Sequence, residues 1–283
     1  MNEYELDDEL IGQVSELSFK YEGGLSFPAP MFWAANGSAK EKAPSPLFYG
    51  GWSVSRQNMD DAVSKERRVL PDGMQAAETV SREGKNLALY VTRSLVVAPV
   101  AYRRSWLTKD RRRLPSYEAG SRQHAQILCV LGMKLKTPSE SGAIYTPWGP
   151  VVLSAKGFQA KNLLGALTSW EDHISALRAA VAKKVPAWLF WCSIGTHGKE
   201  RLQEMVGQGQ NQSPITPIGA YLPDVTEDLL KKLYGGEPLA RQIVDLRAKS
   251  TDWAKAWETA SEPSYDEGGG GNAARADAED IPF

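Results

Sequence analysis

After Glu262 the chain loses the apolar residues that build a core, so its folded body has to lie before that point. A run of glycines starting at Gly268 is followed by small and polar residues, which bury too little apolar surface to repay the entropy lost on ordering. We therefore expect an acidic N-terminal segment over residues 1–22, a folded core over 23–259 and a disordered tail over 260–283.

The composition is that of an ordinary globular protein, with 42% hydrophobic and 24% charged residues. We find no signal-peptide pattern at the N-terminus and no apolar run near the ~20 residues needed to cross a bilayer. The two cysteines, Cys129 and Cys192, lie far apart in apolar stretches, which favours reduced, buried thiols. These features predict a cytoplasmic protein with no membrane partner.

The net charge of -1 conceals an uneven distribution. Residues 1–22 hold seven acids and one base, and residues 258–283 also hold seven acids and one base. The part between them, residues 23–257, keeps 20 acids and 31 bases, a net charge of +11. A basic body of this kind attracts polyanions, while a tethered acidic segment competes for the same surface or engages basic partners.

Several apolar, β-branched stretches predict strands. They comprise residues 87–91, 95–102, 125–136, 151–153 after a turn at 146–150, 187–194, and 215–222 beyond a loop at 207–214. Gly, Pro and Ser around isolated aromatics predict loop and short strand, not helix, over residues 22–51. Residues 103–113 are predicted to form a mobile basic loop between strands.

Apolar residues at three- and four-residue spacing predict a helix over 158–184. Thr226 is a candidate N-cap for a short helix through Tyr234, and Pro238 suits the start of a longer helix ending near Thr259. Two short helical pieces are expected around the turn Pro71-Asp72-Gly73. These elements predict an α+β fold with an oligonucleotide-binding (OB) five-stranded barrel, enlarged by inserted and C-terminal helices, although other α+β folds fit nearly as well.

The chain ends in Ala278-Glu279-Asp280-Ile281-Pro282-Phe283 after a glycine-rich linker. This ending resembles the acidic C-terminal tip of bacterial single-stranded DNA-binding proteins. The resemblance implies that Phe283 anchors in an apolar pocket of a replication or repair protein, with Ile281 as a second contact. It further implies that Pro282 stiffens the tip and that Asp280 and Glu279 guide it electrostatically. The chain is longer than usual bacterial members, which suggests a divergent or phage-encoded version in a bacterial or phage-infected cytoplasm.

Basic and aromatic residues are interspersed between Lys85 and Lys136, a stretch that contains eleven Lys or Arg residues and only two acidic residues. A protein can bind single strands with little sequence preference when its cations contact successive phosphates and its aromatic rings stack on nucleobases. The candidate DNA-binding residues are Tyr90, Arg93, Tyr102, Arg103, Arg104, Trp106, Lys109, Arg111, Arg112, Arg113, Tyr117, Arg122, Lys134 and Lys136, together with Trp33 and Trp52. Ordinary core packing of the aromatics and a solvated basic loop are the alternatives, and we expect Trp148, Trp188, Phe190 and Trp191 to lie in the core.

Signals for catalysis are weak. The sequence Gly195-Thr196-His197-Gly198-Lys199 lacks Walker spacing and the following hydroxyl. The pairs His124 with Cys129 and Cys192 with His197 match no zinc-ligand spacing. The acids and histidine at 171–173 are consecutive on a predicted helix, so they point in different directions. We expect no enzyme activity, no metal and no cofactor.

These features together predict a sequence-independent single-stranded DNA-binding protein that protects exposed strands and recruits partners through its tip. The charge division also predicts that truncation at Gly268 tightens DNA binding. Two alternatives remain open: a strand-annealing recombination protein with the same tail, and a nucleic-acid-processing enzyme that the tail recruits. Homo-oligomerisation is left open as well.

Overall fold

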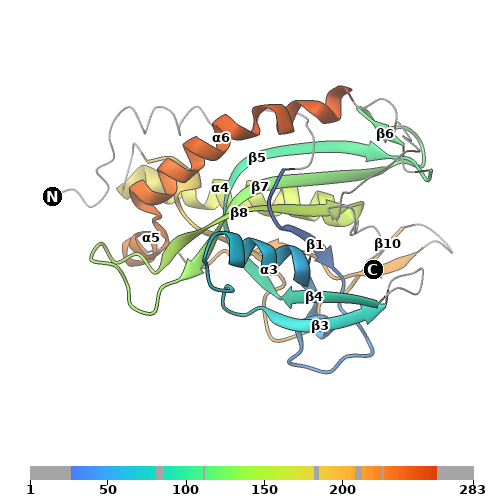
Figure 1. The fold of residues 1–283 in the computed structure, drawn as a ribbon, viewed down its shortest axis with the longest axis horizontal. Helices are drawn as coiled ribbons and strands as arrows, with labels where there is room; N and C mark the ends of the chain where they lie inside the picture. The colour runs from blue at the N-terminus through green and yellow to red at the C-terminus, as the bar shows by residue number, and fades with distance from the viewer. Residues whose placement is uncertain are drawn as a thin grey trace.

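A computed structural model describes residues 27–80, 86–110, 112–181, 185–207, 212–224 and 226–259. The fold is mixed α+β, with one strongly curled sheet that forms a barrel-like half-shell and a few helices packed against it (Figure 1). The acidic N-terminal segment, the tail with its tip, and Arg111 all lie outside the described residues.

The strands are short near the N-terminus and long in the middle of the chain. They are β1 (Met31–Ala35), β2 (Gly51–Ser55), β3 (Gln75–Val80), β4 (Asn86–Thr92), β5 (Ser94–Leu107), β6 (Arg113–Leu114), β7 (Arg122–Lys134), β8 (Tyr145–Lys156), β9 (Cys192–Gly195), β10 (Glu204–Val206), β11 (Ser213–Ile215) and β12 (Gly219–Ala220). The helices are α2 (Pro46–Tyr49), α3 (Arg56–Lys65), α4 (Phe158–Val181), the 3-10 helix η1 (Ala187–Leu189), α5 (Glu227–Leu233) and α6 (Gly236–Thr259).

The main sheet has ten strands in the order β12-β9-β5-β7-β8-β1-β2-β4-β3, with β6 paired to β5. Strands β1 and β8 pair in parallel, and the other described pairs of this sheet are antiparallel. Strands β10 and β11 form a separate hairpin. The long strands β5, β7 and β8 carry the curl of the sheet (Figure 1).

The curl brings the start of β2 against the end of β9, although four strands lie between them along the sheet path. The indole N–H of Trp52 donates to the carbonyl oxygen of Ile194 at 2.9 Å, and the backbone N–H of Thr196 donates to the carbonyl of Arg93 at 2.9 Å. A Cβ at Gly195, where φ is +157°, would stand 2.1 Å from that same Arg93 carbonyl oxygen. Glycine is therefore required where β9 meets the β4–β5 junction, and we call this region the sheet closure.

Helices α4 and α6 pack on opposite faces of the long strands, with α6 in front and α4 behind in Figure 1. Every residue of β7 from His124 to Leu131 is buried, as expected for a strand covered on both faces. The inner side of α4 contributes Leu163, Leu167 and Trp170, which recur at helical spacing and are at most 2% exposed. The core therefore lies in two layers, one on each side of the sheet.

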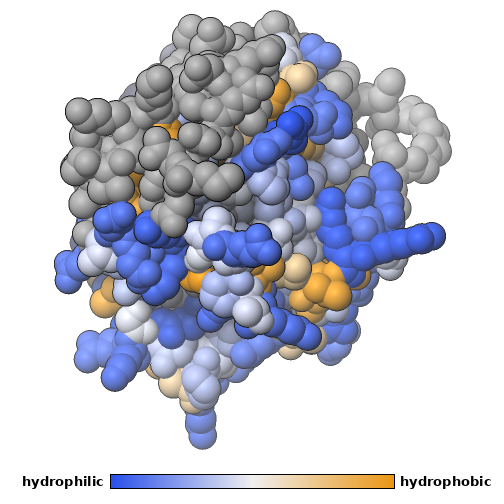
Figure 2. All heavy atoms as spheres, turned by 90° about the vertical axis from the view of Figure 1, so that its left-hand side faces the viewer, coloured by the Kyte–Doolittle hydropathy of each residue, from blue (hydrophilic) through white to orange (hydrophobic). Residues whose placement is uncertain are grey.

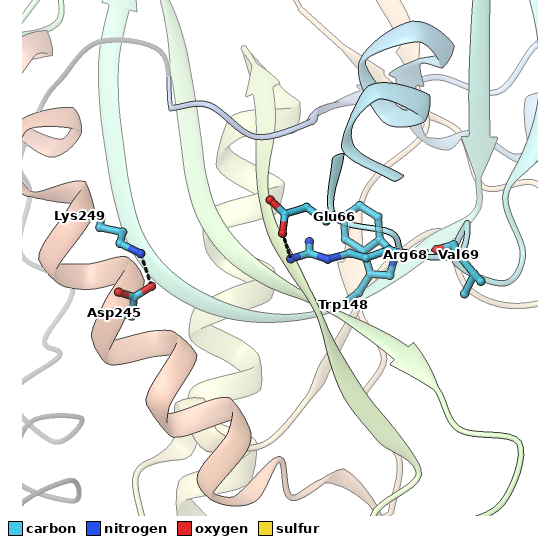
Figure 3. Close-up of polar contacts among 6 residues, drawn as sticks. All are labelled: Glu66, Arg68, Val69, Trp148, Asp245 and Lys249. Carbon is cyan, nitrogen blue, oxygen red and sulfur yellow. Dashed lines mark hydrogen bonds and ion pairs between the residues drawn. The ribbon is translucent and has the colours of Figure 1, made fainter. Parts of the chain in front are cut away.

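The connection between α3 and β3 is held against β8 by one tryptophan (Figure 3). Trp148 is buried, its indole N–H donates to the carbonyl of Val69 at 2.7 Å, and the guanidinium of Arg68 lies 5.0 Å from its ring centroid. Arg68 also pairs with Glu66 at 3.3 Å. On the outer side of α6, Lys249 pairs with Asp245 at 2.6 Å, a favourable i,i+4 spacing (Figure 3).

Many sequence predictions are confirmed. Helix α4 begins where predicted, and α5 begins after Thr226, whose hydroxyl accepts from the backbone N–H of Leu229 at 3.2 Å. Helix α6 begins at Gly236, two residues before Pro238, and ends at Thr259. Strands β4, β5, β7 and β8 cover the strand positions predicted between residues 87 and 153, except that β7 ends at Lys134, two residues before the predicted end. The four residues expected in the core, Trp148, Trp188, Phe190 and Trp191, are all buried.

Other predictions were wrong. Residues 103–107 continue β5 instead of forming a loop, because they pair with the start of β7. The predicted turn at 146–150 lies inside β8, where a register shift opposite Leu131 and Gly132 absorbs the irregularity. The second helical piece beyond the turn at Pro71 is strand β3, because its residues pair along β4.

Three further stretches also differ. Residues 187–189 form η1 before β9, and residues 215–222 contain only the end of β11 and the two residues of β12. Residues 46–49, expected to avoid helix, form α2, which the Ser45 hydroxyl caps. The α+β class and the barrel-like sheet are confirmed, and the sheet has ten strands instead of five.

Candidate nucleic-acid interface

One end of the molecule gathers exposed cations around a hairpin. Strand β6 folds back on the end of β5, with Trp106 opposite Leu114, and β7 starts alongside (Figure 1). The backbone N–H of Thr108 donates to the carbonyl of Arg112 at 3.0 Å and closes the loop between them. We call the described residues from 104 to 122 the hairpin end.

The hairpin end combines positive charge with an open aromatic face. Its described cations are Arg104, Lys109, Arg112, Arg113 and Arg122, against the acids Asp110 and Glu118. Tyr117 is 63% exposed, and its ring packs edge-on against Trp106 with centroids 5.0 Å apart. Arg112 pairs with Glu118 at 3.6 Å, and both side chains are about half exposed, so this pair adds little stability. The arrangement is suited to stacking beside a phosphate chain.

A buried polar network continues from the hairpin end along one sheet face. The guanidinium Nη1 of Arg113 lies 3.3 Å from Nδ1 of His124, and Nε2 of His124 lies 2.9 Å from the Ser154 hydroxyl. Because a guanidinium only donates, Nδ1 must accept, so the imidazole carries its proton on Nε2 and donates to Ser154. Arg113 also donates to the Ser105 hydroxyl at 3.0 Å. The hairpin is therefore held at a defined angle to the sheet.

The pKa of His124 indicates a positive electrostatic potential inside this network. Burial lowers the pKa of its imidazole well below the usual value, and the charges of Arg113, Lys156 and Arg103 lower that pKa further. The ring therefore stays neutral at neutral pH. Three cations from three different strands converge on one point, which favours an anion nearby.

Trp33 joins the network from β1. Its ring stacks on that of His124 at a centroid distance of 6.1 Å and an angle of 26°, and the ammonium of Lys156 lies 5.2 Å from the same indole. Trp33 and Lys156 are both partly buried. The structure thus brings Trp33 to the hairpin end, from which it is about 70 residues away in sequence.

Arg103 is a cation of the interior, so the prediction that it contacts DNA directly does not fit its position. The side chain is 3% exposed and donates to the Gln126 amide oxygen at 2.6 and 2.9 Å and to the carbonyl of Trp253 at 3.1 Å. Its guanidinium also stacks on the Trp253 ring at 4.2 Å. Burial lowers the pKa of Arg103 to about 8, with a smaller effect from Arg113. Arg103 positions α6 against the sheet and adds to the potential around His124.

Trp52 does not offer a stacking face. It is 1% exposed and donates to Ile194 inside the sheet closure, so its role is to fill the core. Tyr102 is partly buried, and burial raises the pKa of its phenol. Trp52 therefore presents no face to a base, whereas Tyr102 stays partly exposed on the side of β5 that also carries Arg104 and Trp106.

The remaining candidates lie elsewhere. The Tyr90 hydroxyl is 3.0 Å from a carboxylate oxygen of Asp60 on α3, and Arg93 stacks on Tyr49 at 3.8 Å while donating to the carbonyl of Gly198 at 2.7 Å. Lys134, at the opposite end of β7, and Lys136 just beyond it are exposed, and the twelve residues from Arg122 to Lys134 span at most roughly 40 Å along the strand. The β7–β8 connection there lies on the side that Figure 2 faces, a mainly hydrophilic surface with scattered hydrophobic side chains.

Sequence reasoning missed Lys156 and Phe158. Lys156 ends β8 and Phe158, 49% exposed, begins α4, with Gly157 between them at a positive φ of 58°. A cation, a glycine and an aromatic residue at a strand-to-helix junction were the available signal. The segment was interpreted only as the start of an amphipathic helix.

Within the described ranges, no group of three or more His, Cys, Asp or Glu side chains is placed to hold a metal ion. Cys129 and Cys192 are buried and free, and burial raises the pKa of each thiol. None of the helices in the described part of the chain is long and apolar enough to span a membrane. The predicted partner-binding residues, from Glu279 to Phe283, lie outside the described residues.

The hairpin end and the network behind it bring together eight of the fourteen candidate positions between residues 90 and 136, namely Arg103, Arg104, Trp106, Lys109, Arg112, Arg113, Tyr117 and Arg122. No family model matches this sequence, and neither a curated protein nor a solved structure matches it.

Proposed function

We propose that this protein binds single-stranded DNA without sequence preference at the hairpin end. The observation that carries the proposal is the exposed ring of Tyr117, packed against Trp106 in a segment that also carries exposed Arg and Lys side chains. Cations neutralise successive phosphates, and the ring stacks on an unpaired base, which is worth ~1–3 kcal/mol per base. The curled sheet acts in this proposal as an OB-type platform that holds the hairpin.

The network around His124 supports this role by fixing the cations before the ligand arrives. Arg113 is held by both Ser105 and His124, so its guanidinium loses little side-chain entropy on binding a phosphate. Lys156 and Arg103 raise the potential at the same place. A duplex presents no free base face to Tyr117, which favours the single strand over the duplex.

The tip supplies the second half of the proposal. Phe283 and Ile281 dock into an apolar pocket of a replication, recombination or repair protein, and the chain-end carboxylate and Asp280 meet basic side chains there. Pull-down of bacterial lysate proteins with and without Phe283 tests this half. Equal capture of the same proteins by both chains would contradict it.

Fluorescence anisotropy of labelled oligo-dT, with duplex of matched length as competitor over a series of salt concentrations, tests DNA binding. We expect tight, salt-dependent binding and strong preference for the single strand. The matched variants are Arg112→Gln with Arg122→Gln at the hairpin end and Lys134→Gln with Lys136→Gln at the far end of β7. Weak or duplex-preferring binding by the unaltered protein would refute the proposal.

Two alternative activities have separate readouts. A strand-annealing protein would accelerate pairing of complementary labelled strands, and a processing enzyme would cleave a labelled oligonucleotide when divalent metal is added. We expect neither under conditions in which oligo-dT is bound.

A further inference from the structure

Three aromatic side chains are exposed in the described part of the chain: Tyr117 at 63%, Phe158 at 49% and Tyr221 at 55%. They come from the hairpin end, the start of α4 and the residue after β12. Single exposed apolar residues are common on protein surfaces, so exposure alone carries no conclusion. The inference below depends instead on the hydrogen bonds and contacts that connect these three positions.

The first connection joins the hairpin end to the start of α4. The backbone N–H of Gly157 donates to the carbonyl of Gln123 at 2.6 Å, directly after Arg122 in β7. Phe158 follows Gly157, and Lys156 precedes it at the end of β8. The second aromatic ring therefore starts from a backbone that is bonded to the hairpin end, beside one of the cations that converge on His124.

The second connection joins the start of α4 to the segment that leads to Tyr221. The Gln159 amide nitrogen donates to the carbonyl of Thr216 at 2.5 Å and to the Asn36 side chain at 3.2 Å. Thr216 precedes Tyr221 by five residues, at most about 18 Å of chain. Strand β12 packs against α4, and the backbone N–H of Tyr221 donates to the carbonyl of Ser193 at 2.8 Å, so this segment is fixed.

Tyr221 is supported in the same way as Tyr117. Its ring packs against His197 with centroids 5.6 Å apart, as Tyr117 packs against Trp106. Burial lowers the pKa of His197, which keeps that ring neutral, and Arg93 lowers the pKa further. Lys199 is exposed two residues beyond His197, and Arg93 is bonded to Gly198. A second exposed ring is thus fixed by another ring and has cations nearby.

We infer that single-stranded DNA bound at the hairpin end continues past Phe158 at the start of α4 to a second stacking platform formed by Tyr221 and His197. The inference rests on the proposed function and adds to it the direction in which the bound strand runs and the length of its path on the protein. Bases stack first on Tyr117 and last on Tyr221, while phosphates pass Arg122, Lys156 and Lys199. Short oligonucleotides fill the first platform alone, and longer ones reach both.

The test is a length series of oligo-dT, from about 4 to about 30 nucleotides, titrated by fluorescence anisotropy against the full chain. The variants are Tyr117→Ala, Tyr221→Ala and Tyr221→Phe. Leu222→Ala is the matched control, because Leu222 is the 43% exposed neighbour of Tyr221 and cannot stack. Thermal unfolding of each variant confirms that these exposed substitutions leave the fold intact.

We expect Tyr117→Ala to weaken binding at every length, and Tyr221→Ala to weaken it about 5-fold or more only above a threshold length. Tyr221→Phe and Leu222→Ala should bind as the unaltered protein does. If Tyr221→Ala matches Leu222→Ala at every length while Tyr117→Ala binds weakly, the second platform is refuted and the proposed function stands. If Tyr221→Ala weakens the shortest oligonucleotides equally, the order along the path is refuted. If the unaltered protein binds no oligo-dT, the proposed function fails with it.

Discussion

The hairpin end and the sheet closure contain the same kinds of residue and use them in opposite ways. At the closure, Trp52 is 1% exposed, Tyr49 is 8% exposed, and Arg93 lies 3.8 Å from the Tyr49 ring. At the hairpin end, Tyr117 is 63% exposed and makes a T-shaped contact with Trp106. Both regions place arginine beside aromatic rings, but Trp52 and Tyr49 are buried at the closure, whereas most of the Tyr117 side chain at the hairpin end is open to solvent.

The difference shows that residue type alone does not separate a candidate binding surface from a structural contact. At the closure the ring face is already covered by a guanidinium, and the indole N–H has a backbone partner. A base would have to displace those contacts before stacking. At the hairpin end 63% of the Tyr117 side chain is exposed, so stacking on its open part displaces mainly water.

The largest effect that sharpens this comparison is expected from Trp52→Ala. Removal of the fully buried indole leaves a cavity and removes its hydrogen bond to the Ile194 carbonyl, so the free energy of unfolding should fall by about 3–5 kcal/mol. Urea denaturation measures the change. Binding of oligo-dT by the folded fraction should be unaltered. A variant as stable as the unaltered protein but unable to bind DNA would reverse the assignment of Trp52 to the core.

Tyr117→Ala should have the converse effect. Its exposed ring contributes little to the core, so the free energy of unfolding should change by no more than about 0.5 kcal/mol. Oligo-dT binding should weaken by about 1–3 kcal/mol, because one base no longer has a ring to stack on. Tyr117→Phe keeps the ring and serves as the control. Equal binding by the Ala and Phe variants would exclude stacking on this side chain.

The two regions also differ in how deeply each buries a histidine, and acid should reveal the difference. Behind the hairpin end, burial and three cations lower the pKa of His124, whereas in the unfolded chain this imidazole takes up a proton near its ordinary pKa of 6.5. The unfolded state therefore binds more protons below about pH 6.5, and stability falls as the pH drops through that range. Next to the closure, burial also lowers the pKa of His197, which is only partly buried, so its effect has the same sign.

The measurement is urea unfolding between neutral pH and about pH 5 for the unaltered protein, His124→Gln and His197→Gln. We expect the pH dependence to flatten most in His124→Gln, because its imidazole is the more deeply buried of the two. Identical slopes in all three proteins would show that neither imidazole is responsible.

The smallest expected effect separates the two ends of β7. Each phosphate contact by a cation contributes about 0.7 to the slope of log affinity against log salt for a single strand. Replacing Arg112 and Arg122 by Gln should lower the slope by roughly that amount for each cation that touches a phosphate. Replacing Lys134 and Lys136 should leave it unchanged, because they lie at and beyond the opposite end of β7 from Arg122. A lower slope in both pairs would mean that the bound strand follows the whole of β7.

The local sequence pattern predicted the helices, because the signals that define a helix lie within the helix itself. The apolar spacing of Leu163, Leu167 and Trp170 predicted α4, and the Thr226 hydroxyl predicted the start of α5, because helix periodicity and capping act over a few residues. The continuation of β5 through Trp106 could not be predicted in this way. That stretch is strand because it pairs with β7, whose residues are about 20 positions later in the chain.

The features of the candidate site can likewise be separated into those that the sequence determines and those that depend on the tertiary structure. The sequence by itself determined that a basic, aromatic-containing middle is flanked by acidic ends, and that the tail ends in an apolar tip, since charge and composition do not depend on folding. Only the tertiary structure decided that Trp52 and Arg103 turn inward, that Tyr117 stays open, and that Trp33 and Lys156 meet at His124. The physical reason is that successive residues of a strand face opposite sides, so pairing and the curl of the sheet choose which side chains meet water.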